Sequence, residues 1–144
     1  PYIVGFGKAI EINEKLKIKE EKRIRKLKDY FWQELKKIAS NVKLNGSVKD
    51  RLPNNLNIYF PGRPSQDLCI ELDLWGVAIS PGVACSARIA KQSYVVAALG
   101  FDGDRAFSSI RITLGRPTTK KEIDFALAIF KRRFKDGIIK IRRS

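Results

Sequence analysis

The first forty residues place apolar and charged side chains with the period of an α-helix. Between residues 24 and 38, apolar side chains recur every three or four positions, and charged or polar residues, Lys and Glu among them, fill most positions between them. This spacing gives a helix one apolar stripe and leaves its other faces to solvent. It predicts one long helix, or two joined helices, over about residues 2–39, ended by Ser40-Asn41. The stripe consists of Ile24, Leu27, Phe31, Leu35 and Ile38.

The rest of the chain divides into short apolar segments separated by turn residues. Residues 108–114 alternate apolar and polar side chains, which is typical of a strand with one buried face. Pairs such as Asn45-Gly46 and Pro61-Gly62 mark turns. Strands are predicted over residues 42–44, 56–60, 77–79 and 108–114, and helices over residues 65–75, over 94–99 and from 119 onward.

Three polar residues stand where helices are predicted to begin. Ser65 and Ser93 are candidate N-caps, because a serine oxygen can accept a hydrogen bond from the first free N–H groups of a helix. Thr119 and Glu122 have the spacing of a capping box. The last helix is then expected to bury Ile123, Leu127, Phe130 and Phe134.

These elements predict an α+β fold, with a small antiparallel sheet covered by helices on one face and a long N-terminal helix. We expect residues 1–144 to form a single domain, with a linking helix over about 1–40 and a small domain over about 41–144. The chain starts at Pro1 rather than Met, which suggests that it was processed, truncated or numbered from inside a longer protein.

The chain is strongly basic, with 29 Lys plus Arg, 15 Asp plus Glu and a formal net charge of +14. Solvated helix faces are the simpler interpretation of this charge; binding to nucleic acid or to an acidic protein is the alternative. No glycine-rich RNA-binding strand and no Cys/His finger supports nucleic-acid binding. Neither a secretory signal nor a membrane-spanning run is visible.

The chain contains two cysteines and no histidine. Two cysteines sixteen positions apart make neither a disulfide framework nor a zinc site, so no metal site is expected. They favour a reducing compartment, and we expect the cytoplasm or an organelle matrix. Without histidine the chain also lacks the commonest general base, so acid–base chemistry would have to come from elsewhere.

The strongest candidate for chemistry is Cys85. It follows the predicted strand 77–79 and lies in an irregular stretch, residues 80–92, among the small residues Gly82, Ala84, Ser86 and Ala87. Loops of that length within compact domains are often functional. Cys69, by contrast, is expected to be a small buried hydrophobic residue of the helix 65–75.

Several segments together resemble group I cysteine desulfurases, the pyridoxal-phosphate enzymes of nitrogen fixation and iron–sulfur assembly in the class V aminotransferase family. They occur in family order across nearly the whole chain. The similar segments are Gly5-Phe6-Gly7-Lys8-Ala9, residues 51–57, Gly82-Val83-Ala84-Cys85-Ser86, residues 92–100, and residues 108–116 with Thr118-Thr119 and Glu122-Ile123-Asp124.

The resemblance implies that the chain is the C-terminal part of a homodimeric enzyme. Cys85 matches the nucleophile that takes sulfur from L-cysteine as a persulfide and passes it to an iron–sulfur scaffold or a sulfur carrier. Arg111 matches the residue that binds the substrate carboxylate, and it points away from the apolar face of its predicted strand. Asn57 and Arg116 match family positions to which we assign structural roles.

The chain also departs from the family pattern. The family commonly has Ser or Thr at the position of Pro81, and Ser at the position of Val83. Proline could stiffen the loop at this point. The cofactor-binding large domain, with its histidine–lysine segment, has no counterpart here, so no pyridoxal phosphate is expected on this chain alone. A selenocysteine lyase, and a cofactor-free basic binding module or inactive remnant, are the alternatives.

Overall fold

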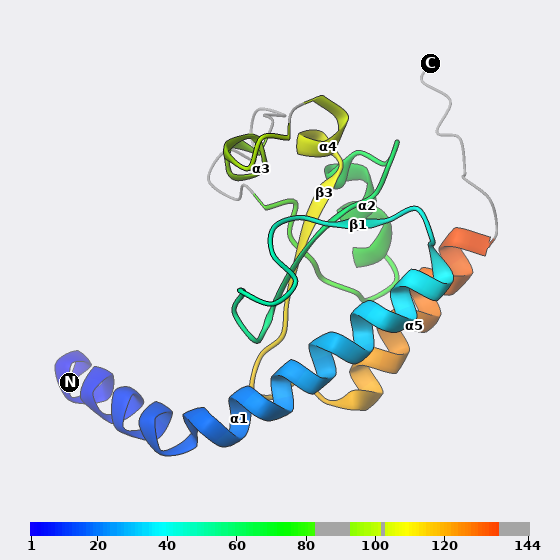
Figure 1. The fold of residues 1–144 in the computed structure, drawn as a ribbon. Coiled ribbons are helices and arrows are strands. Elements are labelled where there is room, and N and C mark those ends of the chain that lie inside the picture. Colours follow the sequence, from blue (N-terminus) through cyan, green and yellow to red (C-terminus); the bar gives the residue numbers. More distant parts are fainter. Residues whose placement is uncertain (83–92, 102, 136–144) are drawn as a thin grey trace.

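The computed structural model describes residues 1–82, 93–101 and 103–135. Helix α1 (Tyr2–Ile38) leads into a three-stranded antiparallel sheet and several further helices (Figure 1). The strands are β1 (Lys43–Leu44), β2 (Asn55–Tyr59) and β3 (Ser109–Thr113), in the order β1-β2-β3. The helices after α1 are α2 (Ser65–Asp73), α3 (Tyr94–Ala98), α4 (Gly103–Phe107) and α5 (Lys120–Lys135).

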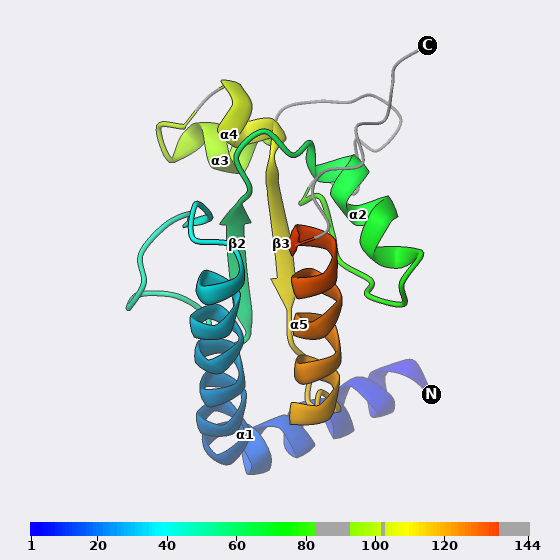
Figure 2. The ribbon, with the colours of Figure 1, turned by 90° about the vertical axis from the view of Figure 1, so that its right-hand side faces the viewer.

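One face of the sheet is covered by α1 and α5, which run side by side (Figure 2). Strand residues alternate between the two faces, so Leu56 and Ile58 of β2 and Ile110 and Ile112 of β3 point toward these helices and are buried. The aromatic centre of this core is formed by Phe31, Phe60, Phe130 and Phe134, whose neighbouring ring centroids lie 5.6–6.1 Å apart. The predicted α+β class, with helices on one face, is confirmed.

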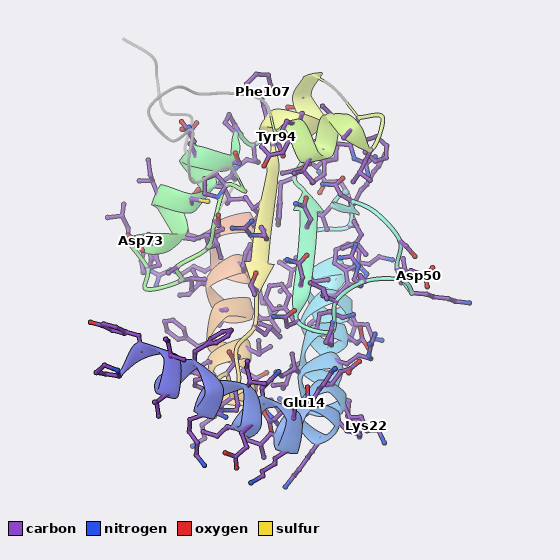
Figure 3. The ribbon with its side chains drawn as sticks, turned by 90° about the vertical axis from the view of Figure 1, so that its left-hand side faces the viewer. Glu14, Lys22, Asp50, Asp73, Tyr94 and Phe107 are labelled. Atoms are coloured by element: carbon purple, nitrogen blue, oxygen red, sulfur yellow. The ribbon has the colours of Figure 1, made fainter. Side chains whose placement is uncertain are left out.

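The long N-terminal helix forms as a single element, and the predicted stripe faces the core only in its second half. Phe31 and Leu35 are buried, and Ile24, Leu27 and Ile38 are partly buried against the core. Residues 1–19 are exposed, and this part of α1 extends beyond the sheet (Figures 1 and 3). The apolar side chains exposed there include Tyr2, Ile3, Phe6 and Ile10.

Two of the three predicted caps are confirmed. Ser93 Oγ accepts from Val96 N at the start of α3. At α5, Thr119 N donates to Glu122 Oε2 at 2.7 Å, while Glu122 N donates to Thr119 Oγ1 at 3.3 Å. The prediction for Ser65 was wrong: Pro64 holds the N-cap position and Ser65 is the first helical residue of α2, with no side-chain cap bond.

The predicted strand over residues 77–79 does not form. Val77 is buried through side-chain packing. Ser80, the residue after the predicted strand, pairs with the sheet in an isolated bridge to Arg111. An apolar run of three residues fits a buried connection as well as a strand, so the pattern alone could not separate them. Helix α4, which the sequence did not predict, directly precedes β3.

Candidate active site

The uncovered face of the sheet is polar and carries Arg111 at the middle of β3. Figure 3 views the molecule from this side, with β2 and β3 in front of the helices. Arg111 is exposed, whereas its neighbours Ile110 and Ile112 are buried on the opposite face. Directly across from it on β2 is Asn57. The predicted orientation of Arg111 is therefore confirmed.

The outer edge of β3 at Arg111 is occupied by Ser80. Arg111 N donates to Ser80 O at 2.8 Å, and Ser80 N donates to Arg111 O at 3.2 Å, which is the reciprocal pair of an antiparallel bridge. The guanidinium adds a longer bond, from Nη2 to Ser80 Oγ at 3.4 Å. Arg111 is thus held between Asn57 on one side and Ser80 on the other.

Next to Arg111, on the same face of the sheet, the buried Asn45, the partly buried Asn57 and the Ser109 hydroxyl hold the three strands together. Asn45 Nδ2, just after β1, donates to Asn57 Oδ1 at 2.7 Å and to Ser109 Oγ at 2.8 Å, so it bridges all three strands. Asn45 Oδ1 in turn accepts from Arg105 Nε at 2.7 Å. Asn57 therefore has the structural role expected for it, since its side chain fixes β2 beside Arg111.

Helix α4 is tied to the same end of the sheet by Asp104. Its carboxylate accepts hydrogen bonds from the Tyr59 hydroxyl, from Ser108 Oγ at 2.8 Å and from Gly62 N at 3.2 Å. These bonds, with Tyr59 as the largest contribution, lower the pKa of Asp104. Asp104 was not predicted from the sequence, because a lone aspartate beside a glycine gives no signal of partners some forty residues away.

Cys85 and the rest of residues 83–92 lie outside the described residues. The described chain leads up to this segment through Ser80, Pro81 and Gly82. Gly82 N donates to Ser80 Oγ at 3.1 Å, and Gly82 has a φ of +91°, a conformation that favours glycine. The same serine therefore touches Arg111 and orders the start of the segment that carries Cys85.

Cys69 is half-buried in α2 and packs against the core. Burial raises the pKa of its thiol to about 11, because desolvation disfavours the thiolate. Since the thiolate is the nucleophile, Cys69 is poorly suited to attack sulfur at neutral pH. This agrees with its predicted character as a small hydrophobic residue, although it is only partly buried.

We expect Cys69 to react slowly with iodoacetamide at pH 8, and about tenfold faster for each unit of pH up to pH 10. The reason is that the thiolate fraction grows tenfold per unit while the pH remains below the raised pKa of Cys69. The measurement is mass spectrometry of the Cys85→Ser variant during alkylation, with the urea-unfolded variant as control. A rate at pH 8 equal to that of the unfolded chain would contradict a burial effect.

Two surface grooves that contain lysines are poorly suited to the phosphate of pyridoxal phosphate. Each also contains carboxylates that would repel it: Glu34 and Asp124 in one groove, and Asp29 in the other. Both grooves are built on α1 rather than beside Arg111. No His, Cys, Asp and Glu side chains within residues 1–82, 93–101 and 103–135 gather into a metal-binding group. In these same ranges no helix is both long and apolar enough to cross a membrane.

Comparison with known proteins supports the sequence-based resemblance. Residues 1–125 match the family model described as Aminotransferase class-V. The chain is 41% identical over 130 residues to the cysteine desulfurase IscS of Dictyoglomus turgidum, covering 90% of this chain and 33% of that protein. It is 36% identical over 144 residues to the cysteine desulfurase IscS 1 of Archaeoglobus fulgidus, covering all of this chain and 36% of that protein.

The fold is shared as well. The crystal structure of a NifS-like protein from Rickettsia africae superimposes with a TM-score of 0.80 and 29% identity, over 93% of this chain and 34% of that one. The chain thus spans about a third of the length of the proteins it matches. It belongs to the class V aminotransferase family, as its resemblance to group I cysteine desulfurases predicted.

Proposed function

We propose that this chain is the C-terminal segment of a pyridoxal-phosphate-dependent cysteine desulfurase and carries two of its functional groups, Cys85 and Arg111. The observation that carries the proposal is the bridge between Ser80 and Arg111. Ser80 precedes Cys85 by five residues, and five residues span at most about 18 Å. The covalent chain therefore limits how far Cys85 can lie from Ser80, the residue that pairs with Arg111.

Arg111 is suited to hold the carboxylate of L-cysteine. A guanidinium offers two parallel N–H groups that match the two oxygens of a carboxylate. Among the described residues, no Asp or Glu forms a salt bridge with Arg111, although several other arginines, such as Arg23 and Arg25, are paired in this way. An exposed arginine at the middle of a polar sheet face is therefore available for an anionic substrate.

Cys85 would take the sulfur. Its thiolate attacks the sulfur of L-cysteine; the new S–S bond forms as the Cβ–S bond of the substrate breaks, and the carbon takes a proton. The products are L-alanine and a persulfide on Cys85, which accounts for every atom of L-cysteine and the thiol. The persulfide sulfur can then pass to a thiolate of a scaffold or carrier protein.

A cofactor-binding large domain would complete the enzyme, since this chain spans about a third of the length of the proteins it matches. Its packing would cover the first turns of α1, where Tyr2, Ile3 and Phe6 are 93%, 88% and 68% exposed. Contiguous exposed apolar side chains of this kind mark interaction surfaces. We propose the whole enzyme to be a homodimer in a reducing compartment such as the cytoplasm.

We expect the isolated 144-residue chain to release no sulfide and form no alanine from L-cysteine, even with added pyridoxal phosphate. The isolated chain is also expected to show no cofactor absorbance after gel filtration, because a lysine without its pocket holds the cofactor only loosely. The full-length enzyme, purified in parallel, is the positive control. Desulfurase activity of the isolated chain would show that this chain holds the cofactor itself.

A basic binding module remains the second candidate because of the net charge of +14. Part of this charge is already neutralised along α1, where Lys8 and Lys15 both pair with Glu11, and Lys37 pairs with Glu34. Activity of the full-length enzyme decides between the candidates, because a binding module would have none.

A further inference from the structure

The contact between Ser80 and the Arg111 guanidinium has a consequence for substrate binding. Strand residues 110 and 112 are fixed by burial, but the Arg111 side chain is exposed on the open face. A long unanchored arginine samples many rotamers, and ordering it opposes ligand binding. Ser80 Oγ, at 3.4 Å from Nη2, is the hydrogen-bond acceptor for this guanidinium in the described part of the chain.

We propose that Ser80 is the positioning residue for the Arg111 guanidinium, so that its hydroxyl prepares the carboxylate site before substrate arrives. This rests on the proposed function and adds to it a residue that does not itself touch the reacting atoms. The main-chain bridge brings the two residues together, and the hydroxyl selects the rotamer.

The Arg111 guanidinium has enough N–H groups to bond to Ser80 and to a substrate carboxylate at the same time. A guanidinium has five N–H donors, and the bond to Ser80 uses one of them. A bidentate carboxylate needs two more. Ser80 Oγ has two lone pairs, and these meet Gly82 N at 3.1 Å and Arg111 Nη2. The Gly82 bond therefore orients the hydroxyl oxygen that receives the guanidinium.

The proposal is tested with Ser80→Ala and Ser80→Thr in the full-length enzyme. Ser80→Ala retains the backbone bridge and loses only the hydroxyl, so the melting temperature is expected to stay close to that of the wild type. We expect the KM for L-cysteine to rise about threefold to tenfold, the factor for one hydrogen bond of ordinary strength, while kcat changes less than twofold. Ser80→Thr keeps a hydroxyl and is expected to restore the KM to within about twofold.

The matched control is Ser47→Ala. Ser47 Oγ accepts from Lys49 N at 3.2 Å, two residues on, just as Ser80 accepts from Gly82 N. Ser47 lies in an exposed loop, and its side chain bonds to Lys49 and Asp50, far from Arg111 in the chain. Removal of the Ser47 hydroxyl is expected to leave the KM for L-cysteine unchanged. This control shows whether loss of a local side-chain bond alone, without loss of a contact to Arg111, affects KM.

A double-mutant cycle identifies the route of the effect. If Ser80 acts through Arg111, Ser80→Ala lowers kcat/KM in the wild-type background and has almost no further effect in Arg111→Ala. An equal loss in both backgrounds, or no loss in either, would overturn the inference while leaving the proposed function intact. By contrast, an inactive wild-type enzyme would refute the proposed function, and an Arg111→Ala enzyme with normal KM would refute the carboxylate site itself.

Discussion

Cys85→Ser in the full-length enzyme is expected to abolish persulfide formation, with residual alanine production below about 1% of wild type. The proposed transfer requires a thiolate that can attack sulfur, and a serine hydroxyl is a far poorer nucleophile at neutral pH. The measurement is mass spectrometry of the intact enzyme and its peptides after incubation with L-cysteine. The added mass of one sulfur is expected on the peptide that contains Cys85.

Cys69→Ser is the matched control, because it removes the other of the two cysteines. Its raised pKa of about 11 leaves almost no thiolate at neutral pH, so this substitution is expected to leave persulfide formation nearly intact. Extra sulfur found on Cys69 in the wild-type enzyme would reverse the assignment of the nucleophile.

Arg111→Lys is expected to lower kcat/KM for L-cysteine about ten- to a hundred-fold with little loss of stability. Lysine keeps the positive charge but loses the planar pair of N–H groups that grips a carboxylate. A charge-assisted hydrogen bond contributes about 1.5–3 kcal/mol, and each 1.4 kcal/mol is a factor of ten. Steady-state alanine production measures the effect, and thermal unfolding checks that the fold is retained.

The control is Arg25→Lys on α1. Arg25 is partly exposed and pairs with Glu21 at 2.9 Å, a role that lysine can also fill, so this variant is expected to match the wild type. If Arg111→Lys also matched the wild type, Arg111 would be an ordinary strand arginine, and the substrate carboxylate would have to bind elsewhere.

The sequence predicted the elements whose stability is local. The capping box of α5 needs only Thr119 and Glu122, three residues apart, and it forms as expected. The alternation along β3 likewise predicted that Ile110 and Ile112 would be buried and Arg111 exposed. In these cases the residues that decide the structure are close neighbours in the chain.

The predictions failed where distant residues decide. Helix α4 has only five residues, too few to be stable alone, and Asp104 ties it to Tyr59 and Gly62, which precede it by 45 and 42 residues in the chain. Similarly, the bridge between Ser80 and Arg111 joins residues 31 positions apart. Sequence periodicity relates only residues that are close in the chain, so it could not predict this pair. The family resemblance suggested a role for Arg111 but did not identify Ser80 as its partner.

The pairing of helices α1 and α5 limits when this part of the chain can fold during synthesis. Arg23 of α1 donates to the carbonyl of Thr118 at 2.8 Å, and Phe31 packs on Phe130. Thr118 is made 95 residues after Arg23. At a ribosomal rate of about 5–20 residues per second, this delay is about 5–20 seconds. Through that interval the stripe containing Phe31 and Leu35 lacks the side of its core that α5 supplies. The emerging chain therefore presents an amphipathic helix that chaperones can bind until α5 leaves the ribosome.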